Sequence, residues 1–355
     1  MSPHPVPRLR AEPLTVVPLA PVPSRPRAVL RPQALSGLWV ALFSSAVFGT
    51  SGAFAKPLLE AGWSPGAAVT ARLAGAALVL LVPALTMLRG RWGTVGANWR
   101  PILLLGVFGV AVCQFAYFQA VERLSVGVAL LLEYLAPVLI VLLLWVRTGR
   151  RPRRYTTAGT LAALVGLVLV LNLTGDQAVD PAGVLWGLGA AAGLVVYFFV
   201  TAKANDALPP LVLATGGLWV GALLMLLLGA TGLLPMEAAF GAVPLAGTPV
   251  PWWVPLGALV LLATVLAYVT GIVAARALGS KVAAFISLTE VLFAVLWAWL
   301  LLGELPLPVQ MLGGAFVIGG VLLVRADELR AGKPKDPELE NPEPEDLEPR
   351  DLLPA

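Results

Sequence analysis

Three charged side chains lie inside long apolar stretches of this sequence. Glu133 stands in LLLEYLAPVLIVLLLW (130–145), Glu290 in LTEVLFAVLWAWLLL (288–302) and Arg72 in TARLAGAALVLL (70–81). A charged side chain at the centre of a bilayer costs about 2.5–3.5 kcal/mol on insertion scales. Each of these residues therefore needs either a partner that compensates its charge or a place in a water-filled cavity.

The composition of the whole chain predicts the environment of these charges. Hydrophobic residues make up 58% of the 355 residues, charged residues make up only 12%, and the mean hydropathy is +0.86. A soluble domain has about 25% charged residues. The composition therefore predicts an α-helical protein that crosses a lipid bilayer several times.

The basic residues, the cysteine and the histidine of the sequence argue against several classes of function. Most basic residues sit in short loops between apolar segments, so the net charge of +4 does not indicate nucleic acid as a partner. The single cysteine, Cys113, allows no disulfide framework, and the single histidine, His4, stands in a proline-rich segment. We therefore expect neither a metal site nor a cofactor.

Ten apolar segments have about the length and composition of membrane-spanning helices. They comprise residues 38–55, 67–88, 101–119, 126–146, 157–172, 183–201, 210–229, 253–275, 282–302 and 309–324. Residues 1–35 and 326–355 are rich in proline, which interrupts helices, and both are interpreted as disordered tails. The ten segments divide into two sets of five, in residues 36–172 and 183–325.

The basic residues of the loops predict an orientation. Five arginines precede the first segment, and five more lie between residues 147 and 154, after the fourth. The alternate loops carry mainly acidic residues, among them Glu60, Asp176 and Glu237. Because cytoplasmic loops are enriched in Lys and Arg, we expect a multi-pass protein of the plasma membrane with both termini in the cytoplasm.

An internal repeat divides the chain in the same way. Residues 148–171 align with residues 302–325 at an offset of 154, which brings Gly159 onto Gly313 and Gly166 onto Gly320. Because five is an odd number, the second set of helices must enter the membrane upside down. The predicted fold is an all-α membrane protein of ten transmembrane helices, arranged as two inverted five-helix repeats. Such repeats recur in secondary transporters, which bind substrate near the midplane.

The depth of the charged residues leaves two interpretations open. Glu133 lies about seven residues, or roughly 10 Å, into the fourth segment from the outer side, and Arg72 enters the second to a comparable depth. Glu290 lies about eight residues into the ninth segment from the inner side. One interpretation is a structural ion pair between Arg72 and Glu133. The other is a wet cavity in which these residues bind a charged substrate or a proton.

Further polar and aromatic residues inside the segments complete the candidate site. They are Gln114, Tyr117, Tyr197, Trp219, Tyr268 and Ser287. Aromatic rings with a polar group suit pockets for small metabolites, although each ring taken alone is more often a packing residue. Lys56, Lys203 and Glu304 are expected at helix ends, where they would extend to the membrane surface or cap a helix.

The order of several motifs resembles a known family. AAFISLTEVLFAVLWAWLLLGELPLPVQMLGGAFVIGGVLL (283–323) resembles the segment that closes each EamA repeat in the drug/metabolite transporter superfamily. FGTSGAFAK (48–56) and ARLAGAALVLL (71–81) resemble the first two helices of that family. The resemblance implies ten helices and the movement of small metabolites, commonly the export of amino acids. GVALLLEYLAPVLIVLL (127–143) is further similar to threonine/homoserine-type exporters.

One departure from the family pattern concerns the ninth segment. Val291 follows Glu290, where the family usually has a proline. Because proline interrupts a helix, its absence argues against a helix break at Glu290.

Three classes of function fit a polytopic membrane protein. We favour a secondary transporter of small polar metabolites, driven by a gradient because no GxxxxGK[ST] phosphate-binding motif is present. A buried carboxylate is a candidate proton carrier, while exchange and uncoupled transport stay open. An intramembrane enzyme needs a set of reactive groups, and the apolar segments contain neither His nor Asp. A non-transporting scaffold is the third class. Substrate, direction and oligomeric state do not follow from the sequence.

Overall fold

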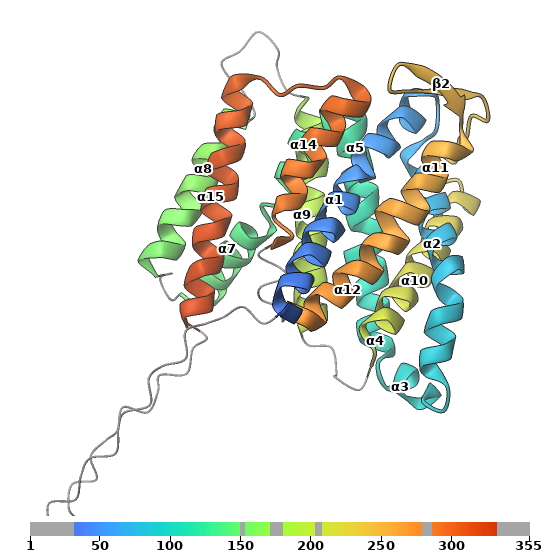
Figure 1. Cartoon of the computed structure of the whole chain (residues 1–355), viewed down its shortest axis with the longest axis horizontal. Helices are drawn as coiled ribbons and strands as arrows, with labels where there is room; N and C mark the ends of the chain where they lie inside the picture. Colours follow the sequence, from blue (N-terminus) through green and yellow to red (C-terminus); the bar gives the residue numbers. More distant parts are fainter. Residues whose placement is uncertain (1–31, 150–152, 171–179, 203–207, 279–285, 332–355) are drawn as a thin grey trace, which may run out of the picture.

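The computed structural model describes residues 32–149, 153–170, 180–202, 208–278 and 286–331. Helices make up nearly all of this part of the chain, and they lie side by side as a bundle (Figure 1). The expected tails fall almost wholly outside the described residues, since the first helix begins at Pro32 and the last ends at Ala331.

The helices follow the predicted apolar segments in order. Up to residue 170 they are α1 (Pro32–Glu60), α2 (Pro65–Leu88), α3 (Trp92–Ala97), α4 (Trp99–Leu104), η1 (Leu105–Val112), α5 (Cys113–Arg123), α6 (Val126–Glu133), α7 (Ala136–Thr148) and α8 (Arg154–Val170). After residue 180 they are α9 (Pro181–Ala202), α10 (Pro210–Ala230), α11 (Trp253–Val260), η2 (Leu261–Leu266), α12 (Ala267–Leu278), α14 (Thr289–Leu302) and α15 (Pro308–Ala331).

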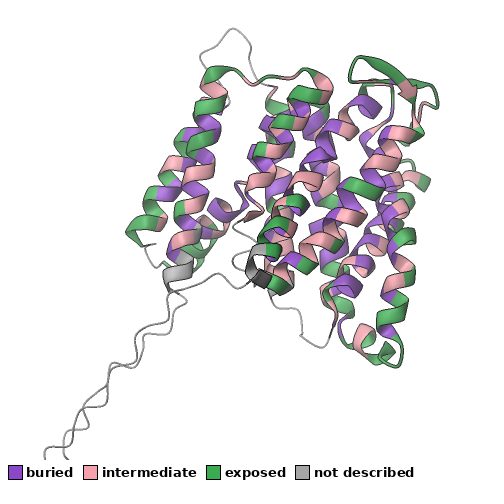
Figure 2. Cartoon of the chain, in the orientation of Figure 1, coloured by how far each residue is buried: buried purple, intermediate pink, exposed green. Residues whose placement is uncertain are grey.

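Length and hydropathy make this a multi-pass membrane protein. Among the described residues, seven helical runs are long and apolar enough to cross a bilayer: Ser36–Glu60, Pro65–Leu88, Trp99–Arg123, Val126–Thr148, Pro181–Thr201, Pro210–Ala230 and Trp253–Ala275. Three shorter apolar helices accompany them: Arg154–Val170, Thr289–Leu302 and Pro308–Val324. Buried positions gather where the helices face one another, and exposed positions lie on outward faces (Figure 2). Leu185, for example, is 70% exposed in the absence of lipid.

Two of the long runs contain a π-helical segment, in which the turns are wider than in an α-helix. η1 lies between α4 and α5, and η2 lies between α11 and α12. Such segments often occur at functional sites because they shift the backbone groups out of the regular ladder. The hydropathy pattern did not predict either segment, since both lie within long apolar stretches.

A break interrupts the run that carries Glu133. α6 ends at Glu133, and α7 begins at Ala136 after two turn residues. Pro137 has no N–H to bond the carbonyl of Glu133, so the ladder cannot continue across this point. The N–H of Tyr134 bonds the carbonyl of Leu130, and the N–H of Leu135 bonds that of Leu132. Glu133 therefore stands at a helix end inside the bundle.

A second break precedes Glu290, and the expectation of an uninterrupted helix there was wrong. Ser287 and Leu288 are turn residues, and α14 begins at Thr289. The N–H of Glu290 bonds the Ser287 carbonyl at 2.9 Å, and the Thr289 hydroxyl donates to the Ile286 carbonyl at 2.7 Å. These local bonds replace regular ladder bonds, so the chain turns here without a proline.

α8 and α15 pack along their length through four glycines (Figure 1). A Cβ at Gly320 would lie 2.4 Å from the carbonyl oxygen of Gly159, and one at Gly313 would lie 2.7 Å from that of Gly166. The two backbones thus approach more closely than any side chain would allow.

We expect Gly320→Ala to destabilise this pair by about 1–3 kcal/mol, because the helices must move apart to admit the methyl group. Gly319→Ala is the matched control, since a Cβ at Gly319 would meet no atom within 4 Å. Thermal unfolding in detergent measures the difference. Equal midpoints for the two variants would show that the close approach of α8 and α15 is not needed for stability.

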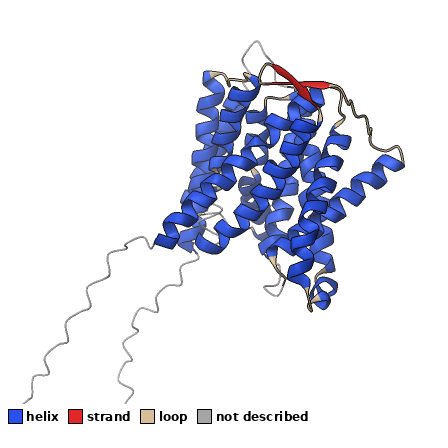
Figure 3. Cartoon of the chain, turned by 45° about the vertical axis from the view of Figure 1, so that its right-hand side comes forward, coloured by secondary structure: helices blue, strands red, loops and turns tan. Residues whose placement is uncertain are grey.

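The segment between α10 and α11 contains a β-hairpin (Figure 3). β1 (Ala242–Leu245) pairs antiparallel with β2 (Thr248–Pro251), with Ala242 opposite Pro251. Both turn residues, Ala246 and Gly247, have positive φ, as a tight two-residue hairpin turn requires. The N–H of Ala246 bonds the carbonyl of Leu301, which fixes the hairpin to the end of α14.

Candidate functional site

Five of the nine predicted site residues line one cavity inside the bundle. They are Arg72, Gln114, Tyr117, Glu133 and Glu290, and Phe48, Gly49, Ser51 and Leu130 complete the wall. These residues come from α1, α2, α5, α6 and α14. The cavity has about 40 Å³ of room for water-sized molecules. Since one water needs about 10–15 Å³ by this measure, the cavity admits only a few waters.

Arg72 is 2% exposed and is held entirely by neutral partners. Its Nε donates to Thr264 Oγ1 at 2.8 Å, and its Nη1 donates to Ser51 Oγ at 2.8 Å and to Gln114 Oε1 at 2.7 Å. Its Nη2 donates to the Ala263 carbonyl at 3.3 Å. Four of its five N–H donors therefore have partners among the described residues.

The ion pair between Arg72 and Glu133, one of the two interpretations from sequence, is not formed. Among the described residues, no carboxylate lies within 4.0 Å of the Arg72 guanidinium. The centroid of the Phe118 ring lies 5.7 Å from the guanidinium carbon, which adds a cation–π contact. A buried cation whose partners are neutral retains its full charge for a further, anionic ligand.

The π-helical segment η2 supplies two of the partners of Arg72. Thr264 donates its hydroxyl to the carbonyl of Leu259, five residues earlier, at 2.9 Å, which leaves its oxygen to accept from Arg72. The neighbouring Ala263 carbonyl accepts the second bond. Thr264 was missed in the sequence because its role depends on the wide turn, which hydropathy does not report.

Glu133 is 9% exposed and stands at the C-terminal end of α6. Its Oε1 lies 3.4 Å from Cys113 Sγ, and the same thiol lies 3.4 Å from the Ala190 carbonyl. Cys113 follows η1 directly, and Gly193 of α9 packs on it, since a Cβ at Gly193 would lie 2.7 Å from Cys113 Cβ. The Glu133 carboxylate thus accepts one weak hydrogen bond from the protein, and one of its sides faces the cavity.

Glu290 lies in the first turn of α14, where the helix dipole favours a negative charge. The hydroxyl of Tyr134 donates to its Oε2 at 2.7 Å. Tyr134 belongs to the break between α6 and α7, so the two broken helices meet at this bond. Tyr134 was not among the predicted site residues, because an aromatic residue next to Glu133 is indistinguishable from packing in sequence.

The other four predicted residues do not line the cavity. Tyr268 lies behind Phe48, with the two rings edge to face at 5.4 Å. The Trp219 indole nitrogen is buried, with no partner among the described residues. Tyr197 packs against Gly109 of η1, and the Ser287 carbonyl lies 3.3 Å from the Tyr134 hydroxyl.

A polar network closes the end of the bundle that carries the hairpin. Lys56 of α1 forms an ion pair with Glu304, which follows α14. The other oxygen of Glu304 accepts the first N–H of α6, from Val126, at 3.0 Å, and Lys56 also donates to the Leu124 carbonyl at 3.2 Å. The expectation that these residues serve helix ends is confirmed for Glu304, and Lys203 lies outside the described residues.

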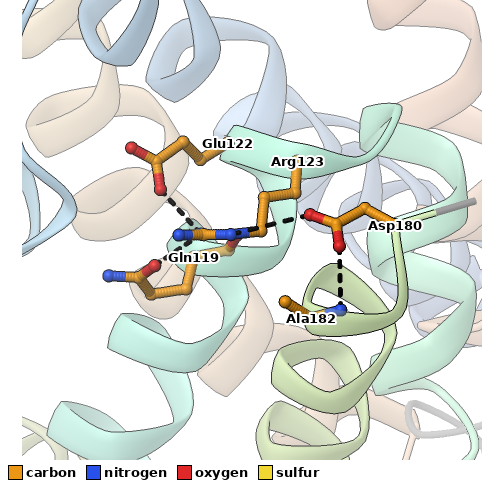
Figure 4. Close-up of polar contacts among 5 residues, drawn as sticks. All are labelled: Gln119, Glu122, Arg123, Asp180 and Ala182. Carbon is orange, nitrogen blue, oxygen red and sulfur yellow. Dashed lines mark hydrogen bonds and ion pairs between the residues drawn. The ribbon is translucent and has the colours of Figure 1, made fainter.

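A second polar cluster surrounds Arg123 at the end of α5 (Figure 4). It donates to the Gln119 carbonyl at 2.8 Å and to Glu122 at 2.7 Å, and its Nε lies 3.8 Å from Asp180 Oδ2. Asp180 in turn accepts the N–H of Ala182 at 2.9 Å and so caps α9. These side chains are partly exposed, so each ion pair contributes little to the stability of the fold.

Comparison with known proteins agrees with the resemblance seen in the sequence. The EamA-like transporter family matches residues 35–172 and 181–326. The chain belongs to this family, and is therefore a membrane transporter of the drug/metabolite type.

Two curated relatives illustrate the range of that family. The chain is 31% identical to the probable terminal-alkyne amino-acid exporter of Streptantibioticus cattleyicolor, over 63% of this chain and 72% of that protein. It is 27% identical to the threonine/homoserine exporter RhtA of Escherichia coli strain K12, over 64% of this chain and 72% of that protein. A solved crystal structure with 20% identity superposes with a TM-score of 0.53, covering 84% of this chain and 99% of that one. The last likeness concerns the fold alone.

Proposed function

We propose that this transporter moves small zwitterionic metabolites, amino acids above all, out of the cell by alternating access, with protons as the coupling ion. The observation that carries the proposal is the cavity, in which one buried arginine faces two carboxylates from two broken helices. An α-amino acid carries one negative and one positive group at neutral pH. Arg72 would bind its carboxylate, and Glu133 or Glu290 would bind its ammonium group.

The size of the cavity supports a moving site rather than an open channel. With about 40 Å³ of room it holds a few waters, which is less than an amino acid needs. Substrate entry therefore requires the helices around the cavity to separate. The polar network of Lys56 and Glu304 would hold the hairpin end closed in this conformation.

The described geometry supports ten spans arranged as two inverted repeats. Adding the sequence offset of 154 to η1, residues 105–112, gives 259–266, which includes all of η2. The break at 134–135 corresponds in the same way to 288–289, next to the observed break at 287–288. The glycines of α8 and α15 meet crosswise, Gly159 with Gly320 and Gly166 with Gly313, as a two-fold axis between equivalent helices would require.

Orientation follows from the arginine-rich loops, which would lie in the cytoplasm together with both termini. In a Cys113→Ser background, we expect Thr248→Cys in the hairpin to react with a membrane-impermeant thiol reagent from outside intact cells. Gly93→Cys in α3 should react only after the membrane is opened. Both positions are exposed in the structure. The reverse pattern would invert the assignment of sides.

Flux through reconstituted vesicles tests the function itself. Purified protein in liposomes is given a panel of labelled amino acids, their decarboxylated amines and nucleosides, with and without an imposed pH gradient. We expect net movement of one or more amino acids that follows the pH gradient. If no zwitterion moves faster than through protein-free liposomes, the proposed function is wrong.

A further inference from the structure

Tyr134 joins the two helix breaks. Its hydroxyl oxygen lies 2.7 Å from Glu290 Oε2 and 3.3 Å from the Ser287 carbonyl oxygen. Tyr134 is itself a residue of the break that follows α6, and Ser287 is a residue of the break that precedes α14. One side chain therefore spans the gap between the helix end that bears Glu133 and the helix start that bears Glu290.

A tyrosine hydroxyl has one proton to donate and an oxygen that accepts. With Glu290 ionised, the proton points at its carboxylate. With Glu290 protonated, the carboxyl group donates to the tyrosine oxygen, and the tyrosine proton turns to the Ser287 carbonyl. Glu290 carries the added proton in this state, and Tyr134 keeps its own. The bond between Tyr134 and Glu290 thus persists in both states with its direction reversed, and the Tyr134 proton turns from the Glu290 carboxylate to the Ser287 carbonyl when Glu290 is protonated.

We propose that Tyr134 is a positioning residue of the transport site, which holds Glu290 in place and transmits its change of charge to the break beside Glu133. The proposal deepens the proposed function and rests on it for the transport step. Among the described residues, the other ionisable groups near Glu290 are Arg72 of α2, Tyr117 of α5, Glu133 of α6 and Tyr197 of α9. The residues of α1 that line the cavity, Phe48, Gly49 and Ser51, are not ionisable.

A packing role for the Tyr134 ring is separable from the role of its hydroxyl. The ring lies against the hydrophobic core, and Tyr134→Phe preserves it. The variant removes only the hydroxyl, and with it the bonds to Glu290 and to the Ser287 carbonyl. Tyr155→Phe is the matched control, because Tyr155 lies at the start of α8 and is 56% exposed.

Infrared spectroscopy of the purified protein tests the hydrogen bond without reference to transport. The carboxylate band of Glu290 at high pH is identified by its loss in Glu290→Gln. We expect this band to move in Tyr134→Phe and to stay in place in Tyr155→Phe. An unmoved band in Tyr134→Phe overturns the proposal, whether or not the wild type transports any compound.

Substrate flux through reconstituted vesicles then tests whether Tyr134 transmits the change of charge at Glu290. We expect Tyr134→Phe to lower the maximal rate about tenfold while KM changes little, because the variant loses a hydrogen bond to a charged group. In a Glu290→Gln background the same change should have little further effect. A full tenfold loss in that background would show that Tyr134 does not act through Glu290. If wild-type vesicles move no substrate, the proposed function fails, and the infrared band still decides the role of Tyr134.

Discussion

Arg72→Lys is expected to fold and to bind its substrate about 10- to 100-fold more weakly than the wild type. Lysine keeps the positive charge but replaces a planar fork of donors by a single ammonium group. The loss corresponds to about one charge-assisted hydrogen bond, at about 1.5–3 kcal/mol. Equilibrium binding of a labelled amino acid to protein in nanodiscs measures it. An amine without the carboxylate should bind both proteins equally.

Arg72→Ala is expected to destabilise the folded protein, whereas Arg72→Lys is expected to weaken only substrate binding. Thr264, Gln114 and Ser51 would each lose the donor that Arg72 gives them inside the bundle, at about 1–3 kcal/mol for each group left unpaired. We therefore expect low yield and a lowered thermal midpoint. Arg123→Ala is the control, because that arginine is partly exposed and its ion pairs contribute little. A well-folded Arg72→Ala protein with unchanged transport would remove Arg72 from the site.

Glu133→Gln is expected to remain folded and to bind substrate, but to lose transport against a gradient. The amide has the shape of the protonated carboxyl group, and its oxygen still accepts from Cys113. It cannot release a proton. Vesicles with an imposed difference of one pH unit provide about 1.4 kcal/mol, or a tenfold ratio, for an exchange of one proton per substrate. Wild-type vesicles should approach that ratio, and Glu133→Gln vesicles should only equilibrate.

The comparison with Glu290→Gln distinguishes the two carboxylates. If Glu133→Gln vesicles still concentrate substrate in response to the pH gradient, Glu133 does not carry the proton. Glu290 would then be the carrier, and Glu290→Gln should abolish accumulation instead. If both variants accumulate substrate as the wild type does, transport is not coupled to protons through this cavity.

Much of the fold could be predicted from sequence because the bilayer imposes simple requirements. Apolar segments of about 20 residues, such as the one that contains Leu80, predicted the positions of the helices. That Arg72, Glu133 and Glu290 line one polar cavity was also predictable, because a charged side chain inside a membrane needs a polar environment. The hairpin with its turn at Ala246–Gly247 could not be predicted, because the turn depends on a backbone conformation that the identities of these two residues do not indicate.

The partners of the charged residues could not be predicted. Thr264 reaches Arg72 only because η2 has a wide turn. Such a turn cannot be recognised in an apolar stretch of sequence. The break before Glu290 forms without a proline, through local bonds of Ser287 and Thr289. Tyr134 reaches Glu290 only because both breaks meet. Each of these contacts depends on backbone irregularity, which hydropathy and spacing do not report.

The central claim, that one cavity opens to either side in turn and binds the substrate, is tested most directly at Leu130. Leu130 lines the cavity, while Leu132, two residues away, packs against Gly187 of α9. In a Cys113→Ser background, Leu130→Cys should react with an impermeant thiol reagent applied from either side of the membrane. Saturating substrate should protect it, and Leu132→Cys should not react. Reaction of Leu130→Cys from one side only, or without protection by substrate, would contradict alternating access through this site.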